Sequence, residues 1–271
     1  METRVNYAVS SLRSGFDDDV GMIGIKGMGG GGKTTLARAV LNQIYNQFQG
    51  KCFIENVSSV HDGKNIIKRL MRSRKVLVVL DDVDHIDQLE ALVGESNWFK
   101  PGSTVIFTTR DEQVLVAHGM KLICNVKLLS DTEGICLFNR YAFGRVIPIE
   151  RYTRLSKQVI HYAGGLPLTI RVLGSFLCGK NELEWMDAIE RLKIIPLMET
   201  MKKLELSYIG LEEDYKEIFL DVACLLQGEP KHLALEALES YGFYARNGLR
   251  VLEQRSLITI DGKHMGMHDY I

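Results

Sequence analysis

A glycine-rich run near the amino terminus has the residue types and the spacing that bind phosphate. It reads Gly27-Met28-Gly29-Gly30-Gly31-Gly32-Lys33-Thr34-Thr35 and fits G-x-x-x-x-G-K-[ST], the phosphate-binding loop or P-loop. Without Cβ atoms, glycines let successive backbone N–H groups point at one phosphate. The Lys33 ammonium is expected to reach the β- and γ-phosphates, and the Thr34 hydroxyl to ligate Mg²⁺. The expected nucleotide contacts in this run are Gly29, Gly30, Gly32, Lys33, Thr34 and Thr35.

Two adjacent carboxylates, Asp81 and Asp82, follow an apolar run at residues 76–80. A strand that ends in acid places carboxylates at the carboxyl edge of a sheet, where open α/β folds bind ligands. One carboxylate can hold Mg²⁺, and the other can orient or deprotonate an attacking water. We assign Asp81 to the metal and Asp82 to the water as the candidate catalytic base. The alternative is a solvated turn after a strand.

A third signal is Arg110, which ends the run Thr108-Thr109-Arg110 after another apolar stretch. An arginine at the edge of the sheet can sense a γ-phosphate. Taken alone, this signal is equally compatible with a surface arginine.

Near the carboxyl terminus, the run Met267-His268-Asp269 says nothing by itself, because a lone histidine is commonly a packed or surface residue.

Strand–helix alternation is needed to position these groups, and the first half of the chain shows it. Short Val- and Ile-rich runs are typical of buried parallel strands. These runs are residues 22–25, 52–57, 76–80, 104–108 and 122–126. Helical patterns lie between them at residues 34–47, 65–72, 86–93 and 112–117. The alternation predicts an α/β P-loop NTPase domain with a parallel sheet over residues 1–129.

The second half of the chain is predicted to be helical up to a terminal hairpin. Ser130 and Glu133 have the spacing of a helix capping box, and Pro167 suits the first turn of a helix. Further helical patterns cover residues 154–163, 182–192, 212–226, 233–240 and 245–254. Asp261-Gly262, between two short apolar runs, is a strong hairpin signal. We therefore predict a helical subdomain at 130–200 and a winged-helix subdomain at 201–271.

Composition limits the partners of this chain. The formal net charge is −1, and residues 201–271 carry eight Lys and Arg against twelve Asp and Glu. Neutralising phosphates requires an excess of positive charge, so nucleic acid is not an expected partner of the winged helix. The chain has neither a charged-then-apolar leader nor an apolar run of about eighteen residues, so no membrane association is expected. Five scattered cysteines fit reduced thiols in the cytoplasm or nucleus.

Taken in order, the motifs resemble those of the NB-ARC region of plant disease-resistance receptors of the nucleotide-binding, leucine-rich-repeat type. They are GMGGGGKTT at 27–35, VLVVLDDVD at 76–84, GSTVIFTTRD at 102–111, AGGLPL at 163–168, FLDVAC at 219–224 and MHD at 267–269. Asp84 and FLDVAC resemble the branch that has an N-terminal TIR domain. The resemblance covers essentially the whole chain and implies a P-loop domain, a helical (ARC1-like) subdomain and a winged-helix (ARC2-like) subdomain.

The resemblance also implies a nucleotide switch in defence signalling. ADP is held in the off state, and exchange for ATP opens the protein for homo-oligomerisation or for protein partners. Arg110 would sense the γ-phosphate, Pro167 would pack near adenine, and His268 would contact the β-phosphate of ADP. Two other functions stay open: a slow ATPase whose turnover matters in itself, and a nucleotide-independent fragment that pairs with full-length receptors.

The chain departs from the family at several positions. Gly31 stands where Ile is usual, Lys26 where Trp is common, and Thr169 where Ala usually follows the GLPL motif. Between residues 57 and 76 we expect one short helix, where the family has roughly two helices more sequence. We expect a truncated core without the TIR domain and the leucine-rich repeats. The chain's first residues resemble a shortened form of the family's opening motif.

Overall fold

The computed structural model describes residues 2–15, 20–55, 74–93, 98–144, 149–192, 194–195, 198–261 and 263–267. The chain divides into two units. Unit 1 comprises Met1–Gly27 and Gly32–Val126, and unit 2 comprises Met28–Gly31 and Lys127–Ile271. The tip of the glycine-rich run therefore belongs, by its contacts, to unit 2, while both ends of the run belong to unit 1.

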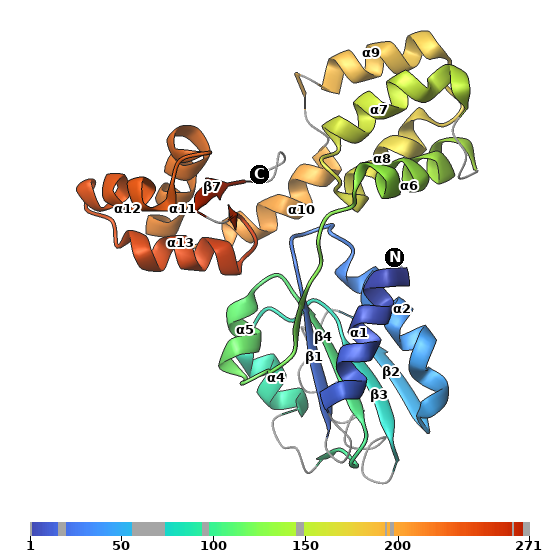
Figure 1. Cartoon of the computed structure of the whole chain (residues 1–271), viewed down its shortest axis with the longest axis vertical. Coiled ribbons are helices and arrows are strands. Elements are labelled where there is room, and N and C mark those ends of the chain that lie inside the picture. Colours follow the sequence, from blue (N-terminus) through green and yellow to red (C-terminus); the bar gives the residue numbers. More distant parts are fainter. Residues whose placement is uncertain are drawn as a thin grey trace. The chain divides into compact units, whose positions relative to one another are not determined.

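Unit 1 is built on a parallel five-stranded sheet with the strand order β2-β3-β4-β1-β5 (Figure 1). Its strands are β1 (Gly21–Lys26), β2 (Gly50–Ile54), β3 (Val76–Leu80), β4 (Thr104–Thr109) and β5 (Ile123–Asn125). Every residue of β3 and β4 is buried, which is typical of a parallel sheet covered on both faces. This order brings the carboxyl ends of β1, β3 and β4 to one edge.

Helices cover both faces of this sheet. They are α1 (Glu2–Gly15), α2 (Lys33–Ile44), α4 (Ile86–Val93) and α5 (Glu112–Ala117), with a 3₁₀ turn, Tyr45–Gln47, after α2. In β3, Leu77 and Val79 pack with α1 and α2, whereas Val78 and Leu80 pack with α4 and α5. This alternation follows from the two-residue period of a strand, and it fixes which helices lie on each face.

Unit 2 begins with helices that share a core containing Trp185. They are α6 (Asp131–Phe143), α7 (Thr153–Tyr162), α8 (Pro167–Leu177) and α9 (Glu182–Leu192), with a 3₁₀ turn, Glu150–Tyr152, before α7. The helix α10 (Met198–Ile209) follows them. Both bonds of the predicted Ser130–Glu133 capping box are present at the start of α6. The Trp185 ring is fully buried against Phe138, Phe143 and Tyr152, so aromatic packing holds this region together.

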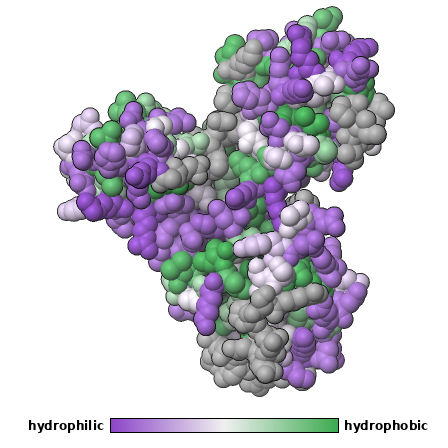
Figure 2. Space-filling model, in the orientation of Figure 1, coloured by the Kyte–Doolittle hydropathy of each residue, from purple (hydrophilic) through white to green (hydrophobic). Residues whose placement is uncertain are grey.

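The rest of unit 2 has a core of its own. It contains α11 (Glu213–Asp221), a π-helical turn (Val222–Leu226), α12 (Lys231–Ser240), α13 (Ala245–Gln254) and an antiparallel hairpin of β6 (Thr259–Asp261) and β7 (His264–Gly266). Leu238, Leu249, Leu252 and Met265 lie together in its interior. The face of this region seen in Figure 2 is mostly hydrophilic. Helices followed by a hairpin are the arrangement that the sequence predicted.

The predicted elements and the observed ones differ in a few places. The helices α1 and α10 were not predicted, although Val5, Ala8 and Leu12 of α1 have helical spacing. Residues 212–226 form an α-helix followed by a π-helical turn, where one helix was expected. The predicted helix at 65–72 lies outside the described residues. The subdomain boundaries at 129/130 and 200/201 stay predictions.

Candidate phosphate-binding site

The glycine-rich run leads into the N-terminus of α2, where no side chain caps the helix. Gly32 is the N-cap residue of α2, with φ 95° and ψ 17°, and makes no side-chain capping bond. This left-handed conformation suits glycine, which has no Cβ to strain it. The first N–H groups of a helix have no partner within the helix and carry its positive dipole end. The start of α2 is therefore suited to an anion such as phosphate.

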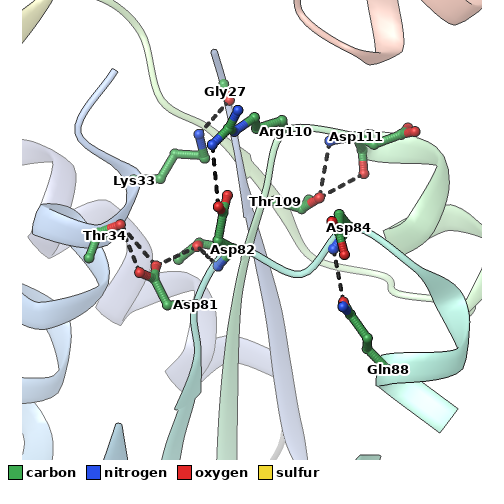
Figure 3. Close-up of polar contacts among 11 residues, drawn as sticks. Gly27, Lys33, Thr34, Asp81, Asp82, Asp84, Gln88, Thr109, Arg110 and Asp111 are labelled. Atoms are coloured by element: carbon green, nitrogen blue, oxygen red, sulfur yellow. Dashed lines mark hydrogen bonds and ion pairs between the residues drawn. The ribbon is translucent and has the colours of Figure 1, made fainter. Parts of the chain in front are cut away.

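Lys33 is held at this N-terminus by burial and by one hydrogen bond. Its Nζ donates to the carbonyl oxygen of Gly27 at 2.8 Å (Figure 3). The side chain is in the interior, and this burial lowers the Lys33 pKa to about 8. The nearby Arg110 guanidinium lowers the pKa further, while Asp82 and Asp81 oppose the shift. A phosphate beside Lys33 would favour its charged form.

Asp81 at the end of β3 is bonded to hydroxyls from two other elements (Figure 3). The Thr34 hydroxyl donates to Asp81 at 2.9 Å (Oδ1) and 3.0 Å (Oδ2). The Thr108 hydroxyl, at the end of β4, donates to Asp81 Oδ1 at 2.6 Å. Thr34 and Asp81 offer oxygen atoms, the donors that Mg²⁺ prefers, and Mg²⁺ in phosphate sites needs only one or two protein ligands. The predicted metal residues therefore lie together and fit that ion.

Asp82 and Arg110 form an ion pair beside this cluster. Arg110 Nη2 lies 3.3 Å from Asp82 Oδ2 (Figure 3). The Asp82 backbone is left-handed, with φ 56°, which aspartate tolerates better than most residues. Its N–H donates to the Thr108 hydroxyl at 2.9 Å, which holds this conformation. The side chain of Asp82 is 43% exposed, so water can reach its carboxylate.

Thr108 is the residue that sequence reasoning missed. Its buried hydroxyl donates to Asp81 and accepts from the N–H of Asp82, so it fixes both carboxylates. The run Thr108-Thr109-Arg110 was singled out only for its arginine. Its place at the end of a buried strand is visible in the sequence, but its role also requires β4 to lie beside β3, which Asp81 follows, and no local pattern shows that pairing.

Lys26, which stands where Trp is common in the family, forms an ion pair within unit 1. Lys26 Nζ lies 2.5 Å from Glu112 Oε2, with both side chains mostly buried. Glu112 opens α5, whose N-cap is Asp111. A cation at residue 26 is thus matched by a carboxylate, which lowers the cost of placing a charge where Trp is common.

The other predicted nucleotide contacts are placed as follows. Thr35 is exposed in the first turn of α2. Gly29, Gly30 and Pro167 belong to unit 2, where Pro167 opens α8. His268 lies outside the described residues. Unit 1 thus gathers Lys33, Thr34, Asp81, Asp82 and Arg110 at one edge of its sheet, and the roles of all these residues stay predictions.

Family models match most of the chain. The NB-ARC domain model matches residues 1–66 and 53–146, and the model "Disease resistance protein Roq1-like, winged-helix domain" matches residues 212–271. The chain belongs to the NB-ARC family of plant disease-resistance proteins, and the predicted resemblance is confirmed. The two NB-ARC segments overlap at 53–66, which reaches into the crossover that was predicted to be short.

Curated relatives are resistance proteins that are much longer than this chain. TMV resistance protein N of Nicotiana glutinosa is 39% identical over 304 aligned residues, covering 100% of this chain and 26% of that protein. Disease resistance protein RPV1 of Vitis rotundifolia is 36% identical over 282 residues, covering 93% of this chain and 20% of that protein. The chain thus spans about a quarter or less of these relatives, which are members of the same family.

Solved structures share the fold at low sequence identity. The Walker-type ATPase PABY2304 of Pyrococcus abyssi has a TM-score of 0.61 and 12% identity, covering 99% of this chain and 93% of that chain. The RuvB Holliday junction branch migration motor of Thermotoga maritima has a TM-score of 0.52 and 16% identity, covering 98% and 90%. These likenesses, with the parallel sheet and the winged-helix match, confirm the predicted fold class. Among the described residues, none of the helices has the length and apolar character needed to cross a membrane.

Proposed function

We propose that this chain is an ADP- and ATP-binding molecular switch of the NB-ARC type that acts in plant defence signalling. Membership of the NB-ARC family supports nucleotide binding and a role in defence. The single observation that carries the proposal is the cluster at the carboxyl edge of the unit 1 sheet. There Thr34 is bonded to Asp81, and Arg110 is paired with Asp82, both beside the buried Lys33.

In this proposal each group at the edge has a part in binding. The nucleotide phosphates lie at the N-terminus of α2. The Lys33 ammonium has three donors, so it can keep its bond to Gly27 and still donate to phosphate. Thr34 and Asp81 hold Mg²⁺, which supplies positive charge to the phosphate oxygens. Pro167 is proposed as an adenine contact and His268 as a β-phosphate contact.

The Arg110–Asp82 pair supports a response that distinguishes ATP from ADP. A γ-phosphate carries more negative charge than one carboxylate, so ATP competes with Asp82 for the Arg110 guanidinium. ADP has no γ-phosphate and leaves the ion pair in place. A ligand shifts a conformational equilibrium only through such differences in affinity. In the ATP state the chain is proposed to bind protein partners or further copies of itself, in the cytoplasm or nucleus.

The proposal is tested by extracting nucleotide from natively purified protein and identifying it by chromatography. Wild-type protein is expected to carry ADP in near-stoichiometric amount. Lys33→Ala is expected to lose it, and Lys157→Ala, an exposed lysine of α7, to retain it. The proposal would be contradicted by folded wild-type protein that carries no nucleotide and takes up none when ADP and Mg²⁺ are added.

A second candidate function is an ATPase whose turnover matters in itself. It is favoured by the exposure of the Asp82 carboxylate, which a water molecule can reach. Steady-state turnover above about 1 s⁻¹, low in the usual enzyme range, would favour this function over a switch.

A nucleotide-independent interaction fragment would instead be supported if Lys33→Ala changed neither nucleotide retention nor stability.

A further inference from the structure

The tip of the phosphate-binding loop is anchored by one apolar side chain. Met28 is only 4% exposed and lies in a cluster with Leu166 and Leu204, flanked by Leu128 and Leu168. The tip, residues 28–31, is otherwise glycine, so Met28 supplies the one side chain that it can bury. We call Met28, Leu166 and Leu204 the loop-anchor cluster.

The backbone of the tip is held at the same place. The N–H of Leu168 donates to the carbonyl oxygen of Gly30 at 3.2 Å. A Cβ atom on Gly30 would lie 2.8 Å from the Leu168 Cβ, and Gly30 is left-handed with φ 75°. The N–H of Gly31 donates to the carbonyl oxygen of Met28 at 3.2 Å, which turns the tip back on itself. These contacts need glycine at residue 30 and fix the course of the loop.

The helix α10 is joined to this anchor twice. Leu204 of α10 belongs to the loop-anchor cluster with Met28 and Leu166. Four residues earlier, the hydroxyl of Thr200 lies 3.1 Å from the hydroxyl of Thr169 in the first turn of α8, and both side chains are buried. Thr169 directly follows Leu168, so neighbouring residues of α8 contact the loop tip and α10. The hydroxyl pair arises at a departure from the family, where alanine is usual.

We propose that α10 sets the shape of the phosphate-binding loop through Leu204 and the Thr169–Thr200 hydrogen bond. Leu204 is a positioning residue in this proposal, because it acts on phosphate only through Met28. A loop whose N–H groups are already aimed at phosphate binds with less loss of entropy than a mobile one. By linkage, nucleotide held by the loop stabilises the packing of α10 to the same extent. This inference rests on the proposed nucleotide binding.

The test uses the full chain, a fluorescent ADP analogue and a matched pair of leucines. Leu204 is 6% exposed in the loop-anchor cluster, and Leu211 is 5% exposed in the core formed by α11–α13. Leu204→Ala is expected to release the analogue about tenfold faster than wild type, within the usual range of coupling between sites. Leu211→Ala is expected to stay within roughly twofold, as changes at independent sites do. Leu204→Met is expected to restore slow release.

A double-mutant cycle separates positioning from a general loss of stability. The effects of Met28→Ala and Leu204→Ala on release should be clearly non-additive, because both substitutions disrupt the same apolar cluster. Equal release rates for Leu204→Ala and Leu211→Ala would overturn the inference. Wild-type protein that binds no analogue would instead overturn the proposed function. If Leu204→Ala does not fold, Thr200→Val takes its place, and unchanged release by that variant overturns the inference.

Discussion

The edge of the sheet in unit 1 and the junction of α8 with α10 in unit 2 are held by opposite chemistries. At the sheet edge, hydroxyls, carboxylates and cations contact one another at hydrogen-bond distances. At the junction, leucines and Met28 pack together, and the hydroxyls of Thr169 and Thr200 form a polar contact between the two helices. Polar groups can recognise the charge of a ligand, whereas apolar packing can only fix shape. The difference indicates that recognition and loop geometry are carried by separate parts of the chain.

The largest expected effect is on the apolar packing of unit 2. Among the described residues, Trp185 has the largest of the fully buried side chains. Its Nε1–H donates to the carbonyl oxygen of Leu177 at 3.0 Å. Trp185→Ala is expected to lower the free energy of unfolding by about 3–5 kcal/mol, because it removes a large buried ring and leaves a cavity. Urea denaturation measures this change, with Trp185→Phe as a milder control. A loss below about 1 kcal/mol would contradict packing as the main source of stability here.

The next largest expected effect is on the ability of the sheet edge to distinguish ATP from ADP. Arg110→Gln is expected to lower the ratio of ATP to ADP affinity by roughly tenfold or more, the worth of a charged hydrogen bond. Loss of the cation also leaves the Asp82 carboxylate unpaired beside the proposed γ-phosphate position, and its repulsion lowers the same ratio further. Asp82→Asn is the control, since it removes the carboxylate that competes with the γ-phosphate for Arg110 and should raise the ratio. Calorimetric titration measures both affinities, and an unchanged ratio in Arg110→Gln would remove Arg110 as the sensor.

Thr108 tests how much the hydrogen bonds at the sheet edge contribute to stability, because its hydroxyl holds both carboxylates there. Thr108→Val keeps the shape of the side chain but removes its bonds to Asp81 and Asp82. The free energy of unfolding is expected to fall by about 1–3 kcal/mol, because buried polar groups lose their partner. Thr104→Val, on the same strand and outside these bonds, is the control. Equal denaturation curves for the two variants would show that Thr108 does not fix the carboxylates.

The smallest effect is a pH dependence from Lys33. Its pKa is lowered from 10.5 to about 8, chiefly by burial, and a bound phosphate would favour the charged form. Nucleotide affinity is therefore fully present below pH 8 and declines as pH rises through it. The decline should reach about eightfold at most between about pH 7.5 and about pH 9. Lys33→Arg stays charged over this range, so its profile should be flat relative to wild type.

Some of this molecule could be predicted from its sequence, and physical reasons explain the rest. The apolar runs of β1, β3 and β4 and the phosphate loop are local patterns, so they predicted the fold and singled out Lys33, Thr34 and Asp81, whose roles stay predictions. The role of Thr108 depends on β3 lying beside β4, and strand order is not a local property. The helix α10 was missed because apolar residues such as Met198, Leu206 and Ile209 are exposed, which obscures its buried face.

The anchoring of the loop tip could not be predicted for a similar reason. Met28 and Leu204 are far apart in the sequence, and their meeting in one apolar cluster leaves no local motif. Gly31 stands where the family usually has Ile, so the tip lacks an apolar side chain at that position. The structure shows that Met28 is buried in the loop-anchor cluster, so the tip retains an apolar anchor without a side chain at residue 31.

Hydrogen exchange of the full chain, loaded with ADP or with a non-hydrolysable ATP analogue, tests the central claim most directly. A switch requires that the two nucleotides stabilise different conformations, and exchange reports local opening along the chain. We expect the amides of α10 and of the segment 166–169 to differ in protection between the two loaded forms. The same protection throughout unit 2, in samples shown by extraction to carry each nucleotide, would contradict the switch.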